Sequence, residues 1–112
     1  MIRWTPLTEL SQLEHIDEAS VSKPMLIFKH STRCSISRMA LKRFEQEYDI
    51  DEAHLECYFL DLLNHRDISN EIAQRWHVQH QSPQVLLIKN NKVIAHDSHD
   101  GIDATAIKRS VA

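Results

Sequence analysis

The clearest pattern in the chain is a set of short apolar runs separated by amphipathic segments. The run Met25-Leu26-Ile27-Phe28 is apolar throughout, which is typical of a strand covered on both faces. Predominantly apolar segments of strand length predict strands at residues 25–28, 55–63, 85–88 and 92–96. Apolar residues at helical spacing between them predict helices over 7–19, 35–48, 66–77 and 103–111.

Two of these helices have features that fix their ends or faces. Thr8 is placed to cap the first helix, because a threonine hydroxyl can accept a hydrogen bond from an unpaired N–H group. In the helix over 35–48, an apolar stripe is expected to face the sheet, consisting of Ile36, Met39, Ala40, Phe44 and Tyr48.

The order of these elements predicts the fold. Strand–helix–strand steps predict parallel pairing with a right-handed crossover. Asn90-Asn91 is a tight-turn signal, because asparagine tolerates positive φ, so the last two strands are expected to form an antiparallel hairpin. The result is an α/β chain with a thioredoxin-like fold, in which a four-stranded mixed sheet has helices on both faces. The 112 residues are expected to form a single domain, residues 1–112.

Composition narrows the function classes. The net charge of −3 and the absence of a basic block give no surface for nucleic acid or an acidic membrane. The eight histidines lack the close spacing of a metal site, so no metal is expected. The start of the chain lacks an apolar leader and no apolar run approaches ~20 residues, so a cytoplasmic location is expected. In a reducing cytosol, the two cysteines are not expected to form a structural disulfide.

Cys34 is the best candidate for chemistry. It follows a buried strand and a polar loop over 29–33, and it precedes an amphipathic helix. The thiolate is the nucleophilic form of cysteine. The unpaired N–H groups and partial positive charge of a helix N-terminus favour an anionic sulfur, and Arg33 adds a fixed positive charge. We therefore expect Cys34 to be the nucleophile of thiol–disulfide exchange.

The motif Cys34-Ser35-Ile36-Ser37 has serine where a dithiol oxidoreductase has its second cysteine. The Ser37 hydroxyl is expected to hydrogen-bond the Cys34 thiolate across one helical turn, as part of the catalytic pair. It cannot attack a mixed disulfide. The pattern therefore predicts a monothiol reaction, in which Cys34 takes a thiol adduct and an outside thiol resolves it.

Ser82-Pro83 is the second signal. It follows a predicted helix and precedes an apolar strand, the place where a thioredoxin fold has a cis-proline opposite its nucleophile. Proline is the residue at which a cis bond costs only ~0.5–1 kcal/mol. The turn is expected to expose the Ser82 backbone, so that an extended substrate can pair with it like an added strand.

Three other residues have side chains that could take part in thiol chemistry: Cys57, His30 and His99. Cys57 lies near the start of its predicted strand, roughly 15 Å from the level of Cys34, so it is expected to fill the core rather than to resolve the adduct. His30 either tunes the thiolate or is a solvated loop residue. His99 is open to the same two interpretations.

The segment Phe28–Ser37 resembles the active-site region of the bacillithiol-system thioredoxin-like family, the monothiol bacilliredoxins. Further resemblances are Ser82-Pro83-Gln84, Asn90-Asn91-Lys92-Val93 and Ser98-His99, so that the likeness covers roughly residues 20–110. It implies a reductase of S-bacillithiolated client proteins that binds no cofactor and uses bacillithiol, a low-molecular-weight thiol, as co-substrate. The family usually has Thr and Pro on either side of the cysteine. Here Arg33 and Ser35 stand there and are expected to affect substrate binding, as are Ser82 and Pro83.

Two other functions stay open. A C-x-x-S motif also occurs in monothiol glutaredoxins, which use an external thiol to carry an iron–sulfur cluster between two subunits. Their C-G-F-S motif has a glycine that Ser35-Ile36 lacks. The third interpretation is a redox-inert module that holds client proteins in the groove at Pro83.

Overall fold

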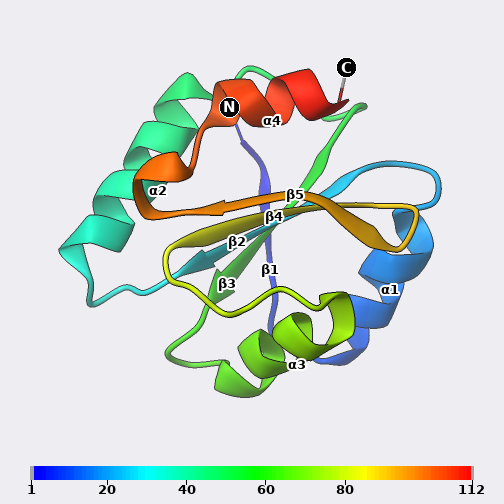
Figure 1. Ribbon diagram of the computed structural model, residues 1–112, viewed down its shortest axis with the longest axis horizontal. Coiled ribbons are helices and arrows are strands. Elements are labelled where there is room, and N and C mark those ends of the chain that lie inside the picture. The colour runs from blue at the N-terminus through cyan, green and yellow to red at the C-terminus, as the bar shows by residue number, and fades with distance from the viewer. Residues whose placement is uncertain (1, 112) are drawn as a thin grey trace.

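A computed structural model describes residues 2–111 as a mixed sheet covered by helices (Figure 1). The sheet has five strands in the order β1-β3-β2-β4-β5. The strands are β1 (Trp4–Pro6), β2 (Met25–His30), β3 (Glu56–Asp61), β4 (Gln84–Lys89) and β5 (Lys92–Ser98). The helices are α1 (Ser11–Ala19), α2 (Ser35–Glu47), α3 (Arg66–Trp76) and α4 (Ala104–Val111), with a short 3-10 turn, η1 (His99–Gly101), before the last. The predicted α/β class is confirmed, with one strand more than expected.

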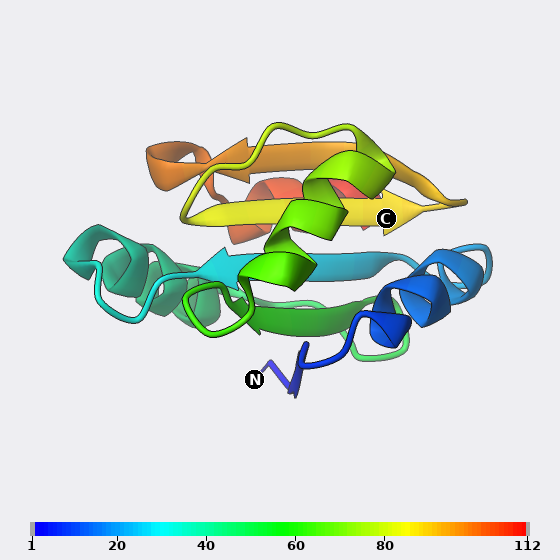
Figure 2. The same cartoon turned by 90° about the horizontal axis from the view of Figure 1, so that it is seen from below.

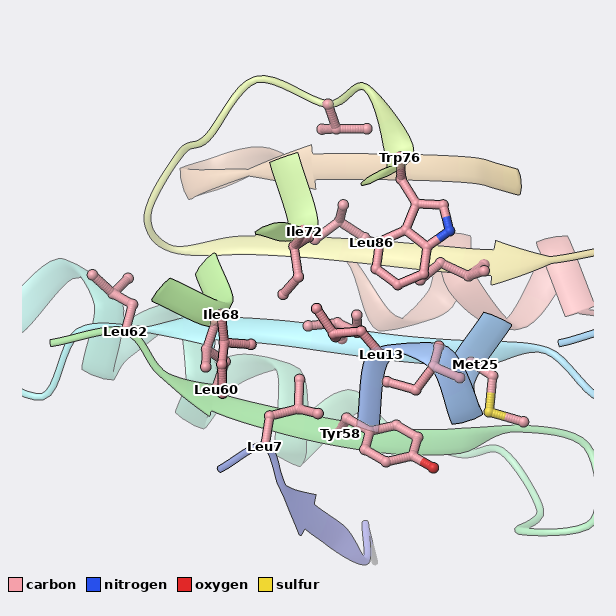
Figure 3. Close-up of a cluster of buried hydrophobic side chains, with 14 residues drawn as sticks. Leu7, Leu13, Met25, Tyr58, Leu60, Leu62, Ile68, Ile72, Trp76 and Leu86 are labelled. Atoms are coloured by element: carbon pink, nitrogen blue, oxygen red, sulfur yellow. The ribbon is translucent and has the colours of Figure 1, made fainter. Parts of the chain in front are cut away.

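Two apolar layers hold the helices on the sheet. In β2, successive side chains point to opposite faces, so Met25 and Ile27 belong to one layer and Leu26 and Phe28 to the other. The first layer packs α1 and α3 against the sheet (Figure 3). The second packs α2 and α4 on the opposite face. Every residue of β2 is buried, and for Met25 to Phe28 this confirms what the unbroken apolar run predicted.

Strand β1 was not predicted. Its three residues pair in parallel with β3, and Trp4 lies opposite Cys57. So short a segment, ending in a proline, shows no alternation to detect, and proline is tolerated there because β1 is an edge strand. The Trp4 ring contacts Phe28 and Phe59 at centroid distances of 5.9 and 5.7 Å.

The second strand–helix–strand step does not give parallel neighbours. Strand β2 pairs in parallel with β3, as predicted, but antiparallel with β4, which lies on its other side. The reason is the segment over 77–83, which runs back along the sheet after α3, so that β4 starts beside the end of β2 (Figure 2). Gln84 therefore pairs with Lys29, and this return brings the Ser82–Pro83 turn to the edge where β2 ends.

Local signals were correct at the hairpin and wrong at the first helix. Asn90 and Asn91 have φ of 52° and 66°, which confirms the tight turn between β4 and β5. Thr8 does not cap α1, which begins only at Ser11. Instead the Gln12 side chain accepts hydrogen bonds from the N–H groups of Thr8 at 2.8 Å and of Glu9 at 2.9 Å. Within residues 2–111 no helix has the length and apolarity to cross a membrane.

Candidate active site

Cys34 is the N-cap residue of α2. Its backbone is extended, with φ −104° and ψ 120°, and its carbonyl accepts a hydrogen bond from Arg38 N at 3.0 Å. Its own N–H donates to the Ser31 carbonyl at 3.2 Å, which closes a turn after β2. The side chain is half-buried, forms no disulfide and makes no capping hydrogen bond to the helix. The sulfur is thus presented at a helix N-terminus without a structural task of its own.

Ser37 does not serve Cys34 in the way the sequence suggested. Its fully buried hydroxyl lies 2.7 Å from His30 Nδ1 and accepts a hydrogen bond from Ser31 N at 3.1 Å. The side chain therefore points from the first turn of α2 back to the end of β2. In this position Ser37 fixes the loop that presents Cys34, and the predicted contact with the sulfur is replaced by one with His30.

His30 and Lys29 were expected in a polar loop, but both are buried residues of β2. The strand continues because its backbone still pairs on both sides, with Lys29 opposite Leu60 on β3. Burial lowers the pKa of His30 below its ordinary value, which keeps the imidazole neutral near pH 7. The loop interpretation of His30 is therefore wrong, and its contact with Ser37 joins the two elements that flank Cys34.

Lys29 is a buried cation that sequence reasoning missed. Its side chain points to the α3 face, where Nζ lies 3.3 Å from His80 Nδ1, and Ser69 Oγ lies 3.2 Å from the same nitrogen. None of the ion pairs among residues 2–111 includes it. Burial lowers the pKa of Lys29 to about 8. The available signal was register, since Lys29 continues the face of Met25 and Ile27.

The residues around the sulfur are exposed. Arg33 and Ser35 flank Cys34 and face solvent. Ile36 and Met39 were predicted to face the sheet, yet they are 57% and 72% exposed. The buried positions of α2 are Ser37, Ala40 and Phe44, which confirms Ala40 and Phe44 of the predicted stripe, whereas Ser37 takes the inward side in place of Ile36 and Met39. Two large apolar side chains therefore lie on the surface of the first two turns of α2.

The Ser82–Pro83 peptide bond is cis, as predicted. Pro83 is buried, and its carbonyl accepts a hydrogen bond from His99 N at 3.2 Å. The Ser82 hydroxyl is buried without a hydrogen-bond partner among the described residues. Because Gln84 pairs with Lys29 near the end of β2, this turn and Cys34 lie at the same edge of the sheet.

The backbone of His99 makes hydrogen bonds that link separate parts of the site. It has a φ of 53°, and its carbonyl accepts a hydrogen bond from the Arg43 guanidinium at 3.4 Å. Arg43 also donates to the Ile102 carbonyl at 3.2 Å. His99 thereby connects the cis-proline turn to α2, while its side chain stays exposed. Across residues 2–111 no group of three His, Cys, Asp or Glu side chains is placed to hold a metal ion.

Cys57 lies at the other end of the sheet. It pairs with Leu26 near the start of β2, whereas Cys34 lies beyond the end of that strand. The four residue-to-residue steps of strand from Leu26 to His30 alone span about 13 Å, which is more than a disulfide can bridge. Cys57 is buried, 3.4 Å from the Tyr48 hydroxyl, and burial raises the pKa of its thiol to about 11. The prediction that it belongs to the core is confirmed.

The fold and this site define a class. A single accessible cysteine at the start of α2, with a cis-proline at the same edge of the sheet, is the arrangement of thioredoxin-type oxidoreductases. Residues 5–107 match the family of the monothiol bacilliredoxin BrxC. The chain belongs to that family, as the resemblance of its active-site segment implied.

Solved structures agree with this assignment. A thioredoxin-fold protein described as a candidate oxidoreductase is 27% identical, with a TM-score of 0.81 over 97% of this chain and 94% of its own. Malassezia sympodialis thioredoxin is 16% identical, with a TM-score of 0.73 over 99% of this chain and 90% of its own. Fasciola hepatica thioredoxin is 14% identical, with a TM-score of 0.69 over 95% and 94%. The two thioredoxins show likeness of fold alone.

Proposed function

We propose that this protein is a monothiol oxidoreductase that removes bacillithiol from S-bacillithiolated client proteins. The observation that carries the proposal is the contrast in access between the two cysteines. The Cys34 side chain is half-exposed and makes no hydrogen bond to its helix, and Cys57 is buried beyond its reach. An adduct formed on Cys34 therefore needs a thiol from outside the chain to resolve it.

The reaction has two exchange steps. The Cys34 thiolate attacks the bacillithiol sulfur of the client disulfide, a new S–S bond forms, and the client leaves as a thiolate that takes a proton from water. A second thiolate, from bacillithiol or a partner protein, then attacks the adduct, restores the Cys34 thiolate and leaves as part of a new disulfide. The client gains two electrons and the attacking thiols lose two, so no other oxidant or reductant is needed.

Surfaces at the same edge of the sheet suit a protein substrate. The Ser82–Pro83 turn can accept the extended backbone of a client beside the sulfur. Ile36 and Met39 offer exposed apolar area on the first two turns of α2, the helix that begins after Cys34. A free disulfide of two small thiols would use neither surface, whereas a client protein would use both.

The test is the transfer of one bacillithiol between proteins. A purified client with a bacillithiol mixed disulfide is mixed with the reduced protein, and intact masses are followed over time. We expect the client to lose one bacillithiol and Cys34 to gain it, with no transfer to a Cys34→Ser variant. Absence of transfer from bacillithiol and glutathione adducts alike would contradict the proposal. It would favour the cluster carrier, recognisable by a brown colour when purified anaerobically, or the redox-inert module.

A further inference from the structure

An open cavity of about 410 Å³ lies beside the loop that carries Cys34. Its lining residues are Thr32, Arg33, Leu63, Asn64 and Arg66. Arg66 is the first residue of α3, and the other four come from two connections, the one between β2 and α2 and the one between β3 and α3, which lie side by side at the left of Figure 2. A hydrogen bond from Leu62 N to the His30 carbonyl at 3.1 Å ties the two together. The volume is within the range of sites for small molecules.

The cavity has two arginines that the fold does not use. Elsewhere near the site, the Arg38 guanidinium donates to the Thr32 carbonyl at 3.0 Å, and Arg43 donates to two backbone carbonyls. Arg33 and Arg66 are exposed, and neither belongs to an ion pair among residues 2–111. Two guanidinium groups that face a cavity without a structural partner are suited to a ligand with carboxylates.

The acidic residues of the same segments do not neutralise this pair. Asp61 Oδ2 accepts a hydrogen bond from Asn64 Nδ2 at 2.8 Å, which fixes the asparagine in the cavity wall. Asp67 lies in the first turn of α3 and forms no ion pair with Arg66 within the described part of the chain. The wall therefore offers an amide and two free cations to a ligand.

The position of the cavity bears on which sulfur of the mixed disulfide Cys34 attacks. A mixed disulfide has two sulfurs, and attack on the wrong one would attach the client, rather than the small thiol, to Cys34. Arg33 is the residue before Cys34, so their Cα atoms are only about 3.8 Å apart. A small thiol held between Arg33 and Arg66 would present its own sulfur to Cys34 and leave the client sulfur as the leaving group.

We propose that this cavity binds the carboxylate-bearing part of the low-molecular-weight thiol, through Arg33 and Arg66, and so directs Cys34 to that thiol's sulfur. The inference rests on the proposed function, because it assigns a site to the small thiol of the same exchange. It also defines a substrate class. Adducts of thiols with carboxylates should react, and adducts of neutral small thiols should react more slowly.

Binding is tested first, without any reaction. A ¹⁵N-labelled Cys34→Ser variant is titrated at low salt with glutathione disulfide, which has carboxylates, and with bis(2-hydroxyethyl) disulfide, which has none. We expect saturable shifts of amides at 32–34 and 63–66 with the first only. Adding Arg66→Gln should weaken the binding at least fivefold, whereas adding Arg109→Gln, an exposed arginine of α4, should not change it. Equal binding of the two disulfides, or shifts confined to other residues, would overturn the proposal.

Reaction is tested second, on the protein with Cys34 intact. A neutral peptide is prepared as its glutathione adduct and as its 2-mercaptoethanol adduct, and the ratio of the two exchange rates is measured. We expect Arg66→Gln to lower this ratio about tenfold and Arg109→Gln to leave it unchanged. An unchanged ratio in Arg66→Gln would overturn the inference while the exchange itself stands. Specific binding in the titration without any exchange would support the cavity and overturn the proposed function.

A third measurement tests whether the carboxylates that the cavity binds belong to the small thiol or to the client. An acidic peptide is prepared as its 2-mercaptoethanol adduct, so that every carboxylate belongs to the peptide. We expect Arg66→Gln to leave its exchange rate within about twofold of that of the protein with Arg66. A tenfold loss would assign the cavity to acidic client segments and overturn the inference.

Discussion

The two ends of the central sheet each have one cysteine, and the two cysteines differ in burial and in their neighbours. Where β2 ends, Cys34 is half-exposed at a helix N-terminus, and the strand and helix that flank it in the chain carry the buried polar residues Lys29, His30 and Ser37. Near the start of β2, Cys57 is buried, and its thiol has one hydrogen-bond partner among residues 2–111, the Tyr48 hydroxyl. The same type of side chain thus lies half-exposed at a helix N-terminus at one end and is part of the core at the other.

The difference shows that position in the sheet determines the exposure and the surroundings of a cysteine. Side chains beyond the end of a parallel strand leave the core, and the helix that follows supplies unpaired N–H groups to an anion. Side chains within a strand gain neither solvent nor a helix terminus. For Cys57 the result is a thiol with a pKa of about 11, which is almost entirely protonated at neutral pH.

The largest expected effect is the loss of thiol–disulfide exchange when Cys34, and not Cys57, is replaced. Cys34→Ser should lower the exchange rate by at least about a thousandfold, because a hydroxyl does not replace a thiolate as nucleophile. Cys57→Ser should leave the rate within about twofold, because that thiol remains protonated in the core. Rates of transfer from a glutathione adduct measure both. Similar losses in the two variants would refute the monothiol mechanism.

Alkylation should distinguish the two cysteines without any mutation. At pH 7.5 iodoacetamide should add one label to the native protein, on Cys34, because about one Cys57 thiol in several thousand is ionised at that pH and the group is buried. Unfolding in guanidinium should expose both cysteines and give two labels. Peptide mass mapping identifies the site. Fast labelling of Cys57 in the native protein would mean that this end of the sheet opens readily.

The elements that carry the site were predictable, because their signals are local. The apolar run of β2 and the cysteine that follows it place the nucleophile at a strand–helix junction. The proline before β4 indicated the cis turn, and Asn90-Asn91 indicated the hairpin. Each of these signals occupies only a few neighbouring residues.

What sequence reasoning missed depends on contacts between distant segments. Lys29 and His30 look like loop residues because they are polar, and only their pairing with β3 and β4 makes them strand. Ile36 and Met39 fit an apolar stripe, but the bond from Ser37 to His30 sets which side of α2 faces inward. Arg66 has no motif, since its cavity is formed only where two connections meet.

Lys29 provides a test of how polar burial affects the end that holds Cys34. Its folded pKa of about 8 lies below the ordinary 10.5, so the buried charge destabilises the fold at neutral pH. We expect Lys29→Met, which keeps a similar volume, to raise the free energy of unfolding by about 2–3 kcal/mol at pH 7. The gain should shrink as pH rises from about 8 to 10.5, where the native lysine loses its proton before the unfolded one does.

Guanidinium unfolding of the native protein and of Lys29→Met at several pH values gives this difference directly. Because Cys57 and the tyrosines titrate in both proteins, their contributions cancel in the comparison. A gain that stays constant from pH 7 to 10.5 would show that Lys29 is not a buried cation. A loss of stability at pH 7 would show that its bond to His80 outweighs the cost of burial.

The smallest expected effects come from removing one hydroxyl at each end, with Ser37→Ala and Tyr48→Phe as a matched pair. Ser37→Ala leaves His30 Nδ1 and Ser31 N without their partner, which should cost about 1–2 kcal/mol of stability and slow exchange severalfold through a looser Cys34 loop. Tyr48→Phe removes only the contact with Cys57, so it should change stability by less than about 1 kcal/mol and leave exchange unaltered. Complete inactivation by Ser37→Ala would instead mean that its hydroxyl meets the sulfur during the reaction, and equal slowing by Tyr48→Phe would mean that the two ends of the sheet are coupled.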